Sequence, residues 1–129
     1  MSLVSKTIVY TAVYSFINNA LSINVYENEG PQDIDEPIAV YFGIGDVPQY
    51  DMNKESLDAD FQVSFYGKKS LGAQALRTYA DTLITALDRK PINIAGYNNE
   101  IVLIREAGRL VVEDDYLHLI IEFNLKAFA

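Results

Sequence analysis

The chain has 129 residues, of which 50% are hydrophobic and 12% aromatic, so it is long and apolar enough to fold as a domain with a packed core. Ten basic against eighteen acidic residues give a formal net charge of −8, which argues against binding nucleic acid through its phosphates and against docking on anionic lipid. The absence of cysteine excludes disulfides and thiolate metal sites. The apolar runs are far shorter than the about 20 residues that span a bilayer, and the N-terminus lacks a signal-peptide pattern.

A helix is predicted for residues 3–21, because apolar residues recur along one stripe and others, including Tyr10 and Tyr14, widen that stripe on a second side. A helix that is apolar over most of its circumference is buried on more than one side. Two interpretations stay open. Either the second side packs against another subunit, or the helix lies in a groove of its own domain.

Two strands are predicted after this helix. Residues 23–26 alternate between apolar and polar, and residues 38–44 are apolar on both faces, which is typical of a central strand. The segment 27–36 between them is rich in acidic residues and contains Gly30 and Pro31, which predicts a solvated loop.

Residues 45–56 have no periodicity and are predicted to form a long loop. Tyr50 and Met52 interrupt its polar sequence, and such residues are enriched in protein interfaces. The alternative is an ordinary connection between two strands. If the loop binds a partner, the candidate contact residues are Asp46, Tyr50, Asp51, Met52, Lys54 and Glu55.

The clearest pattern follows this loop. Residues 57–67 alternate as a strand with one face on a core, and the period then changes to that of an amphipathic helix that ends before Pro91. Lys68 and Lys69 precede this helix, where they would either bind an anion or an acidic partner or remain solvated.

Three strands are predicted in the last third of the chain: a short one beginning at 92–94, one at 101–104 that turns at 107–109 into 110–112, and one at 116–128. The last exceeds the usual strand length, so part of it is predicted to extend beyond its own sheet and pair with another chain. The fold class is therefore α+β, a single domain over 1–129. It has a mixed or mostly antiparallel sheet of about five to six strands, two helices on one face, and the order α-β-β-loop-β-α-β-β-β.

The opposite face of the sheet is predicted to be polar and exposed, with Asp58, Asp60, Gln62 and Ser64 from one strand and His118, Glu122 and Asn124 from another. His118 has no nucleophile in a recognisable motif nearby, and a solvated histidine is the preferred interpretation. Glu122 and Lys126 are roughly 13 Å apart along a strand, too far for the acid–lysine pairs of metal-dependent nucleases. No catalytic residue, metal or cofactor is predicted, and the chain is not expected to be an enzyme.

The whole pattern resembles the tail-terminator (tail-completion) proteins of long-tailed bacteriophages. The corresponding features are the helix ending at 18–21, the segment 25–26 with its acidic loop, the strand 36–42, the strand 61–67 leading into the helix 75–83, and the acidic bend 113–115 before 119–125.

This resemblance implies a structural virion protein at the head–tail junction, made in the cytoplasm of the bacterial host. It would form a homo-oligomeric, hexameric ring that ends polymerisation of the tail tube and joins tail to head. Its partners would be the tail tube protein and a head–tail connector or neck protein, without a membrane. DNA would pass through the ring without sequence recognition. The hypothetical subunit interface comprises Tyr10, Tyr14, Lys68, Lys69, Glu122 and Lys126.

Two alternatives remain from the sequence. One is a small α+β domain that binds a ligand or regulates a partner, and the weaker one is an enzyme that uses His118 and nearby acids.

Overall fold

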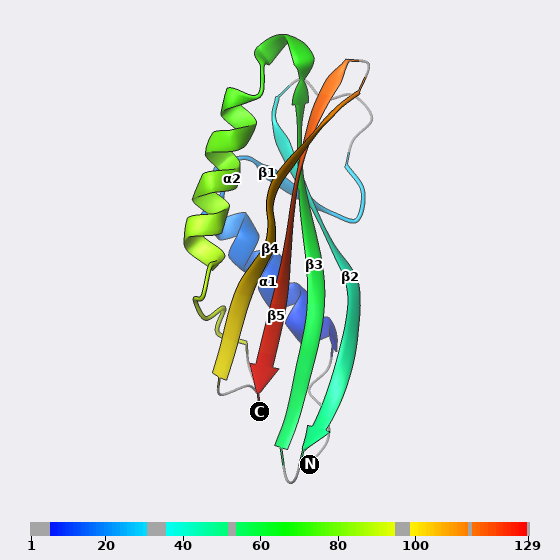
Figure 1. Ribbon diagram of the computed structural model, residues 1–129, viewed down its shortest axis with the longest axis vertical. Coiled ribbons are helices and arrows are strands. Elements are labelled where there is room, and N and C mark those ends of the chain that lie inside the picture. Colours follow the sequence, from blue (N-terminus) through cyan, green and yellow to red (C-terminus); the bar gives the residue numbers. More distant parts are fainter. Residues whose placement is uncertain (1–5, 31–35, 52–53, 95–98, 114, 129) are drawn as a thin grey trace.

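The computed structural model describes residues 6–30, 36–51, 54–94, 99–113 and 115–128, of which 6–7, 46–51, 54–56 and 99 are described by their backbone alone. The elements follow in the order α1 (Lys6–Ala20), β1 (Asn24–Glu27), β2 (Ile38–Asp51), β3 (Lys54–Lys68), a 3₁₀ turn (Lys69–Leu71), α2 (Gln74–Leu87), β4 (Asn99–Val112) and β5 (Tyr116–Phe128). Figure 1 shows both helices on the same face of one long sheet. The predicted α+β class is confirmed. No helix in the described ranges is long and apolar enough to cross a membrane.

The five strands lie in the order β1-β2-β3-β5-β4. β1 runs parallel to β2, whereas the pairs β2–β3, β3–β5 and β4–β5 are antiparallel. β3 and β4 therefore run in the same direction, and α2 is the crossover that connects them on one side of the sheet. One edge of the sheet is formed by β1 and by the part of β2 that β1 does not pair with. The other edge is formed by β4.

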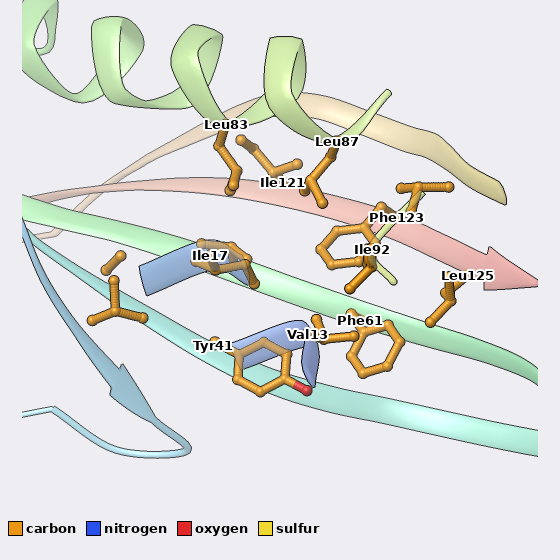
Figure 2. Packing of buried hydrophobic residues seen from close by; sticks show 14 of the residues in the cluster. Val13, Ile17, Tyr41, Phe61, Leu83, Leu87, Ile92, Ile121, Phe123 and Leu125 are labelled. Carbon is orange, nitrogen blue, oxygen red and sulfur yellow. The ribbon is translucent and has the colours of Figure 1, made fainter. Parts of the chain in front are cut away.

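The core lies between this sheet and the two helices, as Figure 2 shows. Helix spacing brings Val9, Val13 and Ile17 of α1, and Leu76, Ala80, Leu83 and Leu87 of α2, onto the sheet. At its centre, the buried Phe61 ring stacks on Tyr41 at 5.7 Å and on Phe123 at 5.3 Å between centroids. The Tyr10 ring meets the edge of the same ring at 5.3 Å. One aromatic row thus crosses three strands and fixes α1 above them.

The predicted long loop over 45–56 is wrong. β2 and β3 continue through this segment as a hairpin, paired down to Asp51 opposite Lys54. The glycines belong to an irregularity between Gly43 and Gly45, where β2 has one residue more than β3. Pro48 is tolerated because it lies on a strand with an unpaired side. Residues typical of turns therefore mark an edge strand here.

Three predictions for the last third are also wrong. Residues 92–94 are not a strand, and the segments 101–104 and 110–112 belong to the single strand β4, which bulges near 107–109 without turning. β5 does not extend beyond its sheet. It pairs with β3 from Tyr116 to Phe128 on one side and with β4 along most of its length on the other.

Gly43 allows α1 to approach β2 closely. A Cβ atom at this position would overlap the ring of Tyr10. The Tyr41 hydroxyl also donates a hydrogen bond to the backbone carbonyl of Tyr10 at 3.2 Å. The first half of α1 is therefore held against β2 at the residue where the irregularity of that strand begins.

Candidate assembly surface

The face of the sheet opposite the helices carries the predicted polar residues, but it is less exposed than expected. Asp58, Asp60 and Gln62 on β3 and His118 and Glu122 on β5 are half-buried, and their register places them side by side across the two strands. Ser64 and Asn124 are fully buried. We call this surface the polar face.

Asn124 organises the middle of the polar face. Its Nδ2 donates to Oδ1 of Asp58, to Oδ1 of Asp60 at 3.0 Å and to the backbone carbonyl of Ala59 at 3.4 Å. Arg105 Nη1 lies 3.6 Å from Oδ1 of Asp60. The Nδ2 group thus holds two carboxylates together beneath the surface, at a residue that the sequence pattern placed in solvent, whereas Oδ1 of Asn124 is buried without a hydrogen-bond partner. The sequence carried no signal for this, because the partners lie on another strand.

His118 lies near the other end of the polar face. Its ring stacks on Tyr66 at 4.2 Å between centroids, and Nδ1 lies 3.8 Å from Oε1 of Glu113. Nε2 is buried without a hydrogen-bond partner. Burial lowers the pKa of His118, against the opposing effect of Glu113. The predicted solvated histidine is therefore largely covered. Within the described residues, no three His, Asp or Glu side chains are grouped to hold a metal ion.

The depressed pKa of His118 predicts how stability depends on pH. The neutral imidazole is favoured in the folded state, so stability is constant above the unfolded pKa of about 6.5 and falls as the pH drops below it toward the folded pKa. Urea unfolding between pH 8 and pH 5.5 should show this decline, and His118→Gln should flatten it. The imidazole is the only one in the chain, so its NMR titration gives a direct check. A pKa of 6.5 or above would contradict the prediction.

The six predicted interface residues do not lie together. Tyr10 and Tyr14 are half-buried on the helix side, where the Tyr14 hydroxyl donates to the carbonyl of Val25 at 3.0 Å. Lys68 is half-buried, Lys69 is exposed, and the Lys69 backbone N–H donates to the carbonyl of Asp115. Glu122 and Lys126 lie on the polar face. Their contact with a neighbouring subunit stays a prediction.

The predicted partner-binding residues lie at the tip of the β2–β3 hairpin, not in a loop. The backbone of Asp46, Tyr50 and Asp51 belongs to β2, and that of Lys54 and Glu55 belongs to β3. Met52 lies outside the described residues. That these side chains bind a partner stays a prediction.

One edge of the sheet is unpaired along most of β2. β1 covers this edge only from Ile38 to Tyr41, and the last hydrogen bond there joins the N–H of Asn28 to the carbonyl of Tyr41 at 2.8 Å. From residue 42 to 51, no strand in the described ranges pairs with this side of β2. Gly43, Ile44 and Gly45 are exposed, and the Ile44 side chain retains 53% of its accessible surface. We call residues 42–51 the free edge of β2.

The opposite edge of the sheet is unpaired along most of β4 among the described residues. The start of β4 is covered by the segment after α2: the N–H of Arg89 donates to the carbonyl of Val102 at 2.8 Å, and the carboxylate of Glu100 accepts from the N–H groups of Ile92 and Ile94. Beyond this, residues 103–112 have no neighbour on that side among the described strands. We call residues 103–112 the free edge of β4. The exposed apolar side chains along it are Leu103, Leu110 and Val112.

Unpaired strands with exposed apolar side chains are templates for pairing with another chain, and monomeric proteins commonly protect such edges. Sequence reasoning missed both edges. The available signal was Pro48 inside an otherwise strand-like segment, because proline is confined to strands with an open side.

The polar face also has a shallow depression of about 270 Å³ at its β1 side. Its lining is mainly apolar, with one carboxylate, and comprises Asn28, Glu29, Gly30, Ile38, Val40, Phe42 and Tyr66. This depression is one site that the ligand-binding alternative could use.

Comparisons with known proteins identify the fold. No protein-family model matches the sequence, and no curated protein matches it. Among solved structures, the chain is similar to a component of the virion of a native gene transfer agent particle, with a TM-score of 0.75 and 13% identity, over 97% of this chain and 100% of that one. A second solved structure, whose name states no function, matches with a TM-score of 0.65 and 12% identity, over 97% and 96% of the two chains. At these identities the likeness shows that the chain shares its fold with a protein built into a phage-like particle.

Proposed function

We propose that the chain is a structural virion protein that forms a ring, hexameric by the family resemblance, at the end of a phage-like tail tube. The ring ends tube polymerisation and joins the tail to the head, through contacts with the tail tube protein and a connector or neck protein. The likeness to a gene transfer agent virion component supports a virion role. The pair of free sheet edges is the observation that carries the ring.

The two free edges are complementary in direction. β2 and β4 run antiparallel to each other within one sheet, because each intervening pair is antiparallel. When copies are placed side by side around an axis, β4 of one copy meets β2 of the next as an antiparallel pair. Two different edges of one chain joined in this way form a heterologous interface, which closes into a ring when the rotation per copy allows it.

The two free edges are also staggered along the strands. The free edge of β4 begins at Leu103, which pairs with Asn124 of β5. Asn124 pairs with Asp60 of β3, and Asp60 pairs with Gly45 of β2, so Leu103 and Gly45 lie at the same height along the sheet. From this level the free part of β4 extends toward one end of the sheet, and most of the free part of β2 extends toward the other. Strands in a closed barrel tilt, and the tilt displaces each copy along the strands of its neighbour. We infer that the polar face points inward in the ring and that the helices, which lie on the opposite face of the sheet (Figure 1), lie outside.

An inward polar face suits the passage of DNA. It mixes acidic and basic side chains, with Asp58, Asp60 and Glu122 beside Arg105, Arg109 and Lys126. Such a surface has no continuous basic stripe to bind phosphates, so DNA would slide without being held.

The native mass as a function of concentration, alone and with the tail tube protein, tests this proposal. We expect a hexamer, or a monomer that forms rings only with the tube protein. A monomer under all conditions would contradict the ring. A stable dimer that binds a small molecule in the depression at Tyr66 would instead favour the ligand-binding alternative.

A further inference from the structure

Besides the irregularities between Gly43 and Gly45 on β2 and between Ile104 and Glu106 on β4, each free edge has one interruption, and the first is on β2. Tyr41 directs its carbonyl away from β3, toward Asn28, and it lies opposite the odd-numbered Val63. Hydrogen-bonding groups alternate along an antiparallel strand, so the positions opposite the odd-numbered residues of β3 point outward. Beyond the irregularity at Gly43, these are positions 46, 48 and 50. Proline has no N–H, and Pro48 therefore leaves this edge without a donor at its middle outward position.

The second interruption is on β4. Val102 directs its carbonyl outward and lies opposite Leu125, so Leu110 and Val112, opposite Leu119 and Leu117, also point outward. Between Glu106 and Arg109, β4 contains one residue more than β5 opposite it: Glu106 pairs with Glu122, and the next pair joins Arg109 to Ile120. The extra residue is a bulge, and Gly108 within it has φ +157, a value that favours glycine. No regular hydrogen-bonded position exists on this part of the edge.

The two faces of the sheet limit how the edges can pair. Position 46 is on the helix side, opposite Ala59, and so is Leu110, opposite Leu119. Position 47 is on the polar face, opposite Asp58, and so is Arg109, opposite Ile120. A pairing that keeps the two faces continuous can therefore shift only in steps of two residues.

We propose that neighbouring copies pair with position 46 opposite Leu110, position 47 opposite Arg109 and Pro48 opposite Gly108 of the next copy. This inference rests on the proposed ring and adds its register. The missing donor of one edge then meets the bulge of the other, and the regular positions 46 and 47 of β2 pair with the regular positions 110 and 109 of β4. The occupant of each free edge is thus a second copy of this chain.

Shifts of two residues are worse in either direction. Pro48 opposite Leu110 would leave the outward carbonyl of Leu110 without a donor. Pro48 opposite Glu106 would place the regular positions Arg109 and Leu110 opposite Gly45 and Ile44, within the irregularity of β2, so no regular pair would remain beside Pro48.

The chain has no cysteine, so engineered disulfides can test the register. Positions 47 and 109 would form a non-hydrogen-bonded pair with Cα atoms about 4.5 Å apart, which suits a disulfide. Within one chain they lie on strands separated by three strand spacings, about 14 Å, so a bond between them joins two copies. The test variant is Val47→Cys with Arg109→Cys. The matched control is Val47→Cys with Val111→Cys, which represents the next allowed register on the same face.

After mild oxidation of the assembled ring, the 47/109 variant should give a ladder of covalent oligomers up to the full ring, with at least tenfold more cross-linking than the 47/111 control. A ring that cross-links better through 47/111, or through neither pair, overturns the register and leaves the proposed ring standing. A chain that stays monomeric with and without tube protein overturns the ring, and the register with it.

Discussion

Replacing Phe61 with alanine is expected to destabilise the domain by about 3–5 kcal/mol, the usual cost of removing a fully buried phenylalanine. Phe61 lies at the crossing of the aromatic row, in contact with the rings of Tyr10, Tyr41 and Phe123. The cavity would therefore open between α1 and three strands at once. Because a domain of this kind has only about 5–15 kcal/mol of total stability, much of the chain would be unfolded or aggregated under mild denaturing conditions.

Urea unfolding followed by circular dichroism measures this effect. Phe128→Ala is the matched control, since the same side chain there is 44% exposed at the end of β5. Its cost should stay below about 1 kcal/mol, as for surface substitutions in general. Similar losses for the two variants would show that the aromatic row is not the centre of the core.

The second large effect is expected on assembly, from Leu110→Pro on the free edge of β4. Proline removes the outward N–H of residue 110 but none of the hydrogen bonds between β4 and β5, so the fold should be retained. A lost hydrogen bond costs about 1 kcal/mol at each interface. A hexameric ring has six equivalent interfaces, so the total of about 6 kcal/mol lowers the assembly constant roughly ten-thousandfold.

Analytical ultracentrifugation of the variant should thus show monomers at concentrations where the unchanged chain forms rings. Leu110→Ala is the control for this experiment, because it shortens the same side chain and keeps the N–H. It should assemble more strongly than the proline variant. Rings of normal stability from Leu110→Pro, with unfolding unchanged, would exclude this edge from the subunit interface.

The sequence predicted the alternation of the central strand well, because it reflects a local rule. Leu57 and Phe61 face the core and Asp58 and Asp60 face away, as their spacing indicates. The helices and their common side of the sheet were also predictable, since an apolar stripe must be covered.

Features that depend on neighbouring strands were not predictable in this way. Gly45 and Pro48 are typical of a loop unless the antiparallel partner continues beside them, and Gly108 is typical of a turn unless β5 runs straight past it. The burial of Asn124 likewise depends on two carboxylates from β3. Open edges are a property of the sheet order, which no single segment encodes.

The contact between Gly43 and Tyr10 would join folding to assembly in the proposed ring. The ring of Tyr10 fills the space above Gly43, and the free edge of β2 begins beside this residue. A copy whose first helix has not yet docked lacks this support at the start of its pairing edge. We therefore expect incompletely folded copies to be poor partners in the proposed ring.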